Sequence, residues 1–171
     1  MTTALSRFFK DSTAQAFRGL TTVLEKAKAT AEAAGTAEQA YLGARLFPDM
    51  NDLKWQVQMI TEFAVRGAAR MSGTAPDDLP NLPMEGETFD ALIGRIAECA
   101  ATVAATDDAT IDGNAGMKIT MPVGPEQTIE LDGETYVLSF FLPNLYFHIT
   151  TAYNLLRMQG VAIGKREYMG M

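Results

Sequence analysis

The sequence of 171 residues has a single cysteine, Cys99, and a single histidine, His148. One cysteine cannot form an internal disulfide bond, so nothing in the sequence indicates an oxidising compartment. A catalytic zinc site ordinarily uses three protein ligands, most of them histidine. One imidazole is too few for such a site, and we therefore expect no metal ion and no other cofactor.

Long apolar runs are also missing, because no uninterrupted stretch approaches the ~18 residues of a membrane-spanning helix. Residues 1–10 lack the basic lead and apolar core of a secretory signal peptide. The formal net charge of −7 repels phosphate backbones. No polybasic segment is present that would bind an anionic membrane. We therefore expect a cytoplasmic protein that binds neither nucleic acid nor membranes.

Apolar residues make up 47% of the chain, which at this length is enough for one buried core without disulfide bonds. Before residue 107 they recur at helical spacing in three segments. These segments span residues 3–34, 52–71 and 88–106. A short helix is expected within residues 38–46, and surface loops over residues 74–86 and 107–116.

The ends of these helices carry recognisable signals. Gly35 is typical of a residue that ends a helix, since glycine readily adopts the left-handed backbone conformation. Short polar side chains accept hydrogen bonds from the free amides at a helix start. We therefore expect Asp49 or Asn51 to cap the second helix and Thr88 to cap the third.

The pattern changes after residue 116. Residues 118–121 and 128–131 alternate polar with apolar side chains, and Asp132-Gly133 is a typical tight-turn pair before another short run at 134–138. A small β-hairpin is therefore expected here. A fourth helix follows over residues 142–158, with Pro143 in its first turn, where a missing amide hydrogen is tolerated.

Four amphipathic segments that cannot bury their apolar stripes alone indicate a helix bundle. We predict a mainly α-helical fold, a four-helix bundle with a small β-hairpin inserted before the last helix. It forms a single domain over residues 1–171.

His148 lies on an apolar stripe of the predicted fourth helix. A lone histidine in this position is typical of a core residue with a hydrogen-bond partner. The alternative is a general base or a metal ligand, with carboxylates such as Asp49 or Glu62 completing the site. Cys99 lies on the apolar stripe of the third helix, which favours an inert buried thiol over a nucleophile.

Polar and aromatic side chains gather on a second face of the fourth helix, and the second helix has a similar group. They either line a ligand cleft between these helices or form a bundle seam or dimer surface with tyrosine hydroxyls in water. No nucleophilic-serine, phosphate-loop or dinucleotide motif selects a reaction. The predicted ligand-cleft residues are His148, Asn144, Tyr146, Tyr153, Arg157, Trp55, Gln56 and Gln58.

Two blocks of sequence resemble a known bacterial family. The first is RLFPDM at residues 45–50, followed by QVQ at 56–58, and the second is LPNLYFH at residues 142–148 with the segment up to residue 166. Both are similar to the family numbered nineteen-ninety-three in the domain-of-unknown-function series. The resemblance spans nearly the whole chain, and the second block fixes many residue identities.

That family is placed in the DinB/YfiT-like superfamily, so the resemblance implies a DinB-like four-helix bundle and a homodimer. Many superfamily members bind a divalent metal through one histidine on helix two and a His-x-x-x-His pair on the last helix. Some are thiol-dependent transferases or isomerases. Here His148 matches one member of the pair, but Asn144 and Ala152 stand four residues away on either side and helix two has no histidine. We therefore do not carry the metal site over.

Three functions remain open, and whether the protein is an enzyme stays open with them. The first is a homodimer that binds a small ligand without a metal. The second is a DinB-like thiol-dependent transferase or metalloenzyme with a degenerate site at His148. The third is an interaction protein without a small ligand. The sequence selects no substrate.

Overall fold

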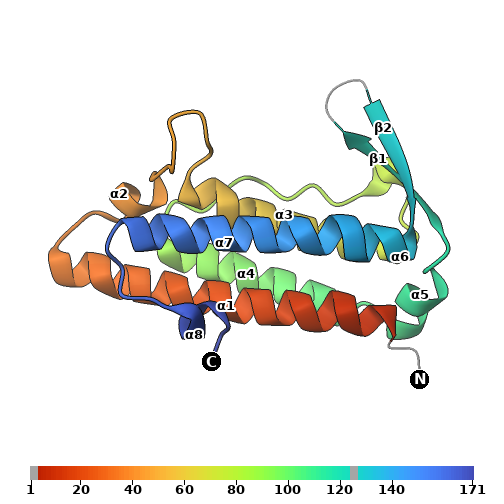
Figure 1. Ribbon diagram of the computed structural model, residues 1–171, viewed down its shortest axis with the longest axis horizontal. Coiled ribbons are helices and arrows are strands. Elements are labelled where there is room, and N and C mark those ends of the chain that lie inside the picture. The colour runs from red at the N-terminus through yellow and green to blue at the C-terminus, as the bar shows by residue number, and fades with distance from the viewer. Residues whose placement is uncertain (1–3, 124–126) are drawn as a thin grey trace.

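Four long helices run side by side in the computed structural model, which describes residues 4–123 and 127–171 (Figure 1). They are α1 (Leu5–Ala34), α3 (Leu53–Met71), α4 (Phe89–Ala104) and α7 (Leu142–Met158). The shorter elements are α2 (Glu38–Leu42), the 3-10 turn η1 (Pro76–Asp78), α5 (Asp108–Gly113), β1 (Lys118–Val123), β2 (Gln127–Asp132), α6 (Gly133–Thr135), the π-helical turn η2 (Tyr136–Phe141) and α8 (Lys165–Tyr168). The predicted bundle with a hairpin before its last long helix is confirmed. Among the described residues, no helix has the length and apolar character needed to cross a membrane.

The core lies where the apolar stripes of the four helices meet. On α3 every residue of the expected stripe is buried, and on α4 the same holds. The buried stripe residues are Leu53, Val57, Ile60, Ala64, Ala68 and Met71 on α3 and Leu92, Ile96, Cys99 and Val103 on α4. The helical spacing of apolar residues therefore positions the bundle correctly.

The helix ends follow the expected chemistry with one correction. Gly35 adopts a left-handed conformation with φ of 60° after α1, and Thr88 Oγ1 accepts from Ala91 N at 3.1 Å at the start of α4. The cap of α3 is Asp52, whose Oδ1 accepts from Trp55 N at 2.9 Å. The prediction of Asp49 or Asn51 was wrong because Asp52 is the residue with extended backbone directly before the first helical turn.

The hairpin pairs β1 with β2 in antiparallel register from Lys118 opposite Asp132 to Val123 opposite Gln127. Ile119 and Met121 are buried, while Lys118 Nζ lies 3.1 Å from Glu130 Oε1 on the outer face. The strands are therefore placed as the alternation predicts. The chain connecting them, residues 124–126, lies outside the described residues.

The expected tight turn at Asp132-Gly133 was wrong, as was the extended run after it. Asp132 Oδ1 accepts from Thr135 N at 2.7 Å and caps α6, and residues 134–138 are helical. A Cβ at Gly133 would lie 2.3 Å from Asn114 O, so this position admits only glycine. Aspartate followed by glycine suits a helix start as well as a turn, and here the amide of Glu134 in that first turn also donates to Ala115 O at 2.8 Å.

The last helical stretch is longer than predicted, because α6, η2 and α7 follow one another without a break from Gly133 to Met158. Pro143 therefore lies inside this stretch instead of at its start. Proline supplies no amide hydrogen and its ring crowds the preceding turn. The wider π-helical turn η2 ends at Phe141, two residues before Pro143, and Asn144 Nδ2 donates to Phe140 O at 2.7 Å.

The predicted surface loop at 107–116 was also wrong. Asp107 Oδ2 accepts from Thr110 N at 2.8 Å and caps the short helix α5. Ile111 on this helix is fully buried. Asp112 Oδ1 accepts from Ser6 N at 2.7 Å, which ties α5 to the start of α1. A single buried isoleucine in an acidic segment is too weak a pattern to indicate a helix.

Candidate functional site

His148 is the buried centre of a cluster that joins α7 to α3. Its Nδ1 lies 2.8 Å from Gln56 Oε1, and Gln56 Nε2 donates to Asn51 O at 3.3 Å. Since the amide group of Gln56 is oriented by that second bond, Oε1 faces the imidazole and Nδ1 carries the proton. The Nε2 atom of His148 is then left with a lone pair, which accepts a hydrogen bond or a proton.

Three aromatic rings surround the imidazole. Its ring centroid lies 5.5 Å from Trp55, 5.7 Å from Phe63 and 5.2 Å from Phe147. Burial among these rings lowers the pKa of His148 below its ordinary value of 6.5, because the charged imidazolium loses hydration there. The neutral imidazole is therefore the form that the cluster stabilises near neutral pH.

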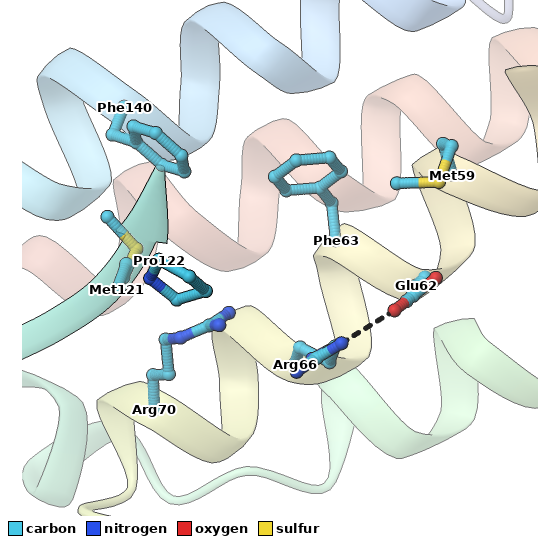
Figure 2. A pocket seen from close by; sticks show the side chains of 8 residues that line it. All are labelled: Met59, Glu62, Phe63, Arg66, Arg70, Met121, Pro122 and Phe140. Atoms are coloured by element: carbon cyan, nitrogen blue, oxygen red, sulfur yellow. Dashed lines mark hydrogen bonds and ion pairs between the residues drawn. The ribbon is translucent and has the colours of Figure 1, made fainter. Parts of the chain in front are cut away.

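A cavity of about 160 Å³ lies next to this cluster, between α3, β1 and η2 (Figure 2). Phe63 is shared, since its ring contacts His148 and also faces the cavity. The apolar wall is completed by Met59, Met121, Pro122 and Phe140, and the charged lining residues are Glu62, Arg66 and Arg70.

The charged groups of the cavity are held in different ways. Arg66 Nη1 lies 2.8 Å from Glu62 Oε1, one helical turn away on α3, as the dashed line in Figure 2 marks. The guanidinium carbon of Arg70 lies over the ring of Tyr136, 5.9 Å from its centroid. The Nε atoms of both arginines are buried and have no hydrogen-bond partner among the described residues. Such unpaired donors are unusual inside proteins.

The predicted cleft residues separate into groups. Trp55 and Gln56 lie with His148, and Asn144 lies one turn earlier on α7. Gln58 is buried and donates to Glu85 O at 3.0 Å in the loop before α4. The remaining residues lie elsewhere on α7: Tyr146 is exposed, Tyr153 Oη donates to Ile163 O at 3.5 Å, and Arg157 donates to Val161 O.

The structure thus gathers His148, Trp55 and Gln56, whereas Tyr153 and Arg157 hold the C-terminal tail. Tyr153 also packs edge-on against Tyr168 of α8, with 5.8 Å between the ring centroids. A role in ligand binding stays a prediction for the whole set. The sequence did not single out the cavity arginines.

The family model described as "Domain of unknown function (DUF1993)" matches residues 10–169. The chain belongs to this family. Among solved structures, a DinB family member from Shewanella denitrificans is similar to this DUF1993 protein, with 31% sequence identity and a TM-score of 0.87 over 98% of this chain and 92% of that one. The DinB-like fold implied by the resemblance is thus confirmed. No curated protein sequence matches the chain.

The three-histidine metal site of many DinB-like proteins does not fit this DUF1993 protein. His148 Nδ1 is bonded to Gln56, Asn144 Nδ2 donates to Phe140 O, and Ala152 has no donor atom. Glu62 is paired with Arg66, and Asp49 lies on an exposed turn. Across residues 4–123 and 127–171, no group of three or more His, Cys, Asp or Glu side chains could hold a metal ion.

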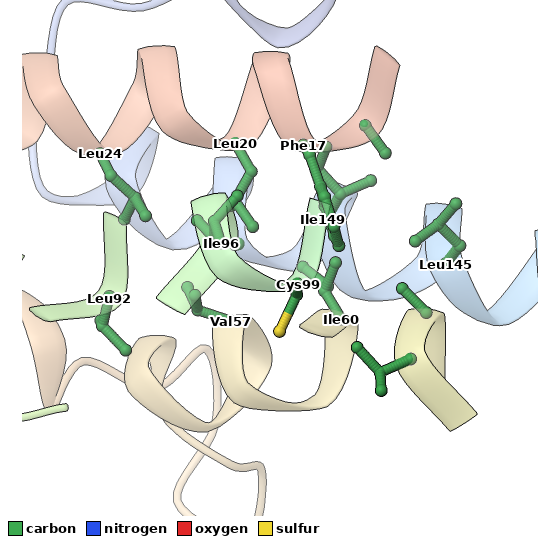
Figure 3. Packing of buried hydrophobic residues seen from close by; sticks show 14 of the residues in the cluster. Phe17, Leu20, Leu24, Val57, Ile60, Leu92, Ile96, Cys99, Leu145 and Ile149 are labelled. Atoms are coloured by element: carbon green, nitrogen blue, oxygen red, sulfur yellow. The ribbon is translucent and has the colours of Figure 1, made fainter. Parts of the chain in front are cut away.

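Cys99 lies in the core of the DUF1993 protein, and Figure 3 shows it with apolar residues of α3, α4 and α7. It is 4% exposed, and burial raises the pKa of its thiol. A thiol that resists deprotonation is a poor nucleophile. The inert structural role favoured by its apolar stripe therefore agrees with its surroundings.

One sequence signal could have indicated the cavity. Glu62, Arg66 and Arg70 recur every four residues, which places them on one face of α3 beside Phe63. Such a run is usually a solvated helix face. In the folded protein β1 and η2 lie against this face and form the cavity together with it.

Proposed function

We propose that this DUF1993 protein binds a small organic ligand in the cavity between α3, β1 and η2, without a protein-bound metal ion. The observation that carries the proposal is the lining of the cavity, in which five apolar side chains face two arginines and one glutamate. Ligand pockets typically combine a mostly apolar wall with a few charged or polar groups that orient the ligand.

The size of the cavity limits the ligand. It holds about 160 Å³, and an apolar cavity of about 150 Å³ accommodates a benzene molecule. The ligand, or the part of it that is enclosed, is therefore the size of one aromatic ring or a short branched chain.

Binding is tested by ¹³C-methyl methionine NMR, because Met59 and Met121 line the cavity. Met158 is 56% exposed at the opposite end of α7 and serves as the control. The probes are benzoate, benzyl alcohol and benzylamine, which share one ring and differ in charge. At least one probe is expected to shift the Met59 and Met121 methyl signals with saturation while leaving Met158 unchanged. If none does at millimolar concentration, the proposal is wrong.

A second candidate is a transferase or metalloenzyme centred on His148, favoured by the lone pair that Gln56 leaves on His148 Nε2. Elemental analysis of protein purified without a histidine tag separates it from metal-free binding. Stoichiometric zinc or nickel that is lost in His148→Ala would overturn the metal-free proposal. We expect no stoichiometric metal in either protein.

A further inference from the structure

The charged groups of the cavity do not balance. The Glu62 carboxylate is compensated by Arg66 at 2.8 Å. Arg70 forms no ion pair with any residue in the described part of the chain. The lining therefore carries one uncompensated positive charge, in a protein whose formal net charge is −7. Such a local excess attracts an anion.

Arg70 is also held in position. Its guanidinium lies 5.9 Å from the centroid of the Tyr136 ring, within the range of a cation–π contact. Tyr136 is fully buried, and its ring stacks on Phe140 with 5.9 Å between the centroids and an interplanar angle of 22°. A charged group that is already oriented loses less entropy when it binds a ligand.

Arg70 and Phe140 thus face one cavity and are linked through Tyr136. Figure 2 shows the guanidinium of Arg70 close to Pro122 of β1, with the rings of Phe63 and Phe140 on the other side of the cavity. A ligand lying between them would meet a cation at one end and apolar surface at the other.

Building on the proposed function, we infer that the ligand is a monocarboxylate with a small apolar body, and that Arg70 binds its carboxylate. The planar guanidinium matches a carboxylate with two parallel hydrogen bonds. One uncompensated charge suits a monoanion better than a phosphate dianion, and the apolar wall of Phe63, Phe140 and Met59 suits a ring or branched chain. Glu62 keeps Arg66 neutralised and so limits the site to a single anionic group.

The test compares the three one-ring probes on the wild-type protein and on two variants. Benzoate is the probe for the inferred class, benzyl alcohol is its neutral counterpart, and benzylamine is the cation. Arg70→Met removes the positive charge and the paired N–H donors of the guanidinium while keeping an apolar side chain of similar length. Arg7→Met removes one positive charge from an exposed side chain on α1 and controls for net charge. The Met59 and Met121 methyl shifts give each dissociation constant.

In the wild-type protein benzoate is expected to bind about tenfold or more tightly than benzyl alcohol, and benzylamine weakest, since one charge-assisted interaction is worth that much. Arg70→Met should abolish the preference for benzoate and leave benzyl alcohol nearly unchanged, whereas Arg7→Met should change neither. Arg70→Lys keeps the positive charge but cannot make two parallel hydrogen bonds to a carboxylate, so it should retain part of the preference for benzoate over benzyl alcohol.

The outcomes separate the two proposals. Equal binding of benzoate and benzyl alcohol at the cavity methyls would overturn the carboxylate inference while the proposed function stands. The absence of binding by all three probes would overturn both. If Arg70→Met does not fold, the wild-type protein and Arg70→Lys still test the inference. Equal affinity of the wild-type protein for benzoate and benzyl alcohol would overturn it, and so would an unchanged preference for benzoate in Arg70→Lys.

Discussion

Replacing Gly19 by alanine should weaken the docking of the C-terminal helix α8 on α1. A methyl group at Gly19 would lie 2.0 Å from Tyr168 O, whereas real Cβ contacts essentially never fall below 3.0 Å. The α8 backbone must therefore move away by at least the difference between these distances. Such a movement strains the bonds that hold the tail, including Gln15 Nε2 to Tyr168 O at 3.3 Å and Lys26 to Glu167 at 2.7 Å.

The magnitude follows from two opposing terms. Alanine in place of glycine inside a helix gains about 0.8–1 kcal/mol of stability, and forcing an extra methyl into a packed site costs about 1–3 kcal/mol. Gly94 on α4 is the matched control, because a Cβ there would have no heavy atom within 4 Å. Since both variants share the propensity gain, their difference isolates the steric cost. We expect Gly19→Ala to be less stable than Gly94→Ala by about 1–3 kcal/mol.

Urea unfolding measures both free energies, and hydrogen exchange of the α8 amides locates the effect. Exchange should quicken at the hydrogen-bonded amides of Tyr168, Met169 and Gly170 in Gly19→Ala and stay unchanged in Gly94→Ala. If Gly19→Ala were as stable as Gly94→Ala with full protection of α8, the close packing of the tail on α1 would be refuted.

Three further predictions concern buried and charged groups. Leu156→Ala removes a fully buried side chain of α7 and should cost about 2–5 kcal/mol in urea unfolding; a cost below about 0.5 kcal/mol, typical of surface positions, would contradict the core position. Burial lowers the pKa of His148 in the folded state below 6.5. As the pH is lowered below 6.5, the imidazole is therefore protonated in the unfolded chain before it is protonated in the folded protein. The free energy of unfolding of the wild-type protein, relative to that of His148→Gln, should decrease over this range until the folded imidazole is protonated as well. A pH-independent difference would be evidence against the buried neutral imidazole. Lys26 and the Gly164 amide hold the pKa of Glu167 at about 2 against 4.5, so its stabilising contribution is complete above pH 4.5 and is lost as the pH falls through about 2. Protection of the α8 amides should therefore decline over that range, and Glu167→Gln should lack this acid dependence.

The long helices could be predicted because each carries its own apolar stripe, and a stripe is a local property of the sequence. The hairpin strands were predictable for the same reason. The helix start at Asp132 was not, because aspartate followed by glycine suits a turn equally well. The contacts that accompany this helix start come from elsewhere in the chain, since Asn114 O lies against Gly133 and Ala115 O accepts from Glu134 N at 2.8 Å.

The candidate site was predictable only in part. His148, Trp55 and Gln56 stood out by residue type on amphipathic helices and do lie together, although none of them lines the cavity and their role in ligand binding stays a prediction. Arg66 and Arg70 have the spacing of an ordinary solvated face, and the elements that cover them, β1 and η2, come much later in the sequence. Contacts between elements distant in sequence leave no local pattern.

The central claim, that the cavity beside Phe63 receives a small carboxylate, is tested most directly by intermolecular nuclear Overhauser effects from bound benzoate in solution. Ring protons of benzoate should show contacts to the methyl groups of Met59 and Met121 and none to Met158. Contacts to Met158, or saturable binding without any contact to Met59 and Met121, would contradict it.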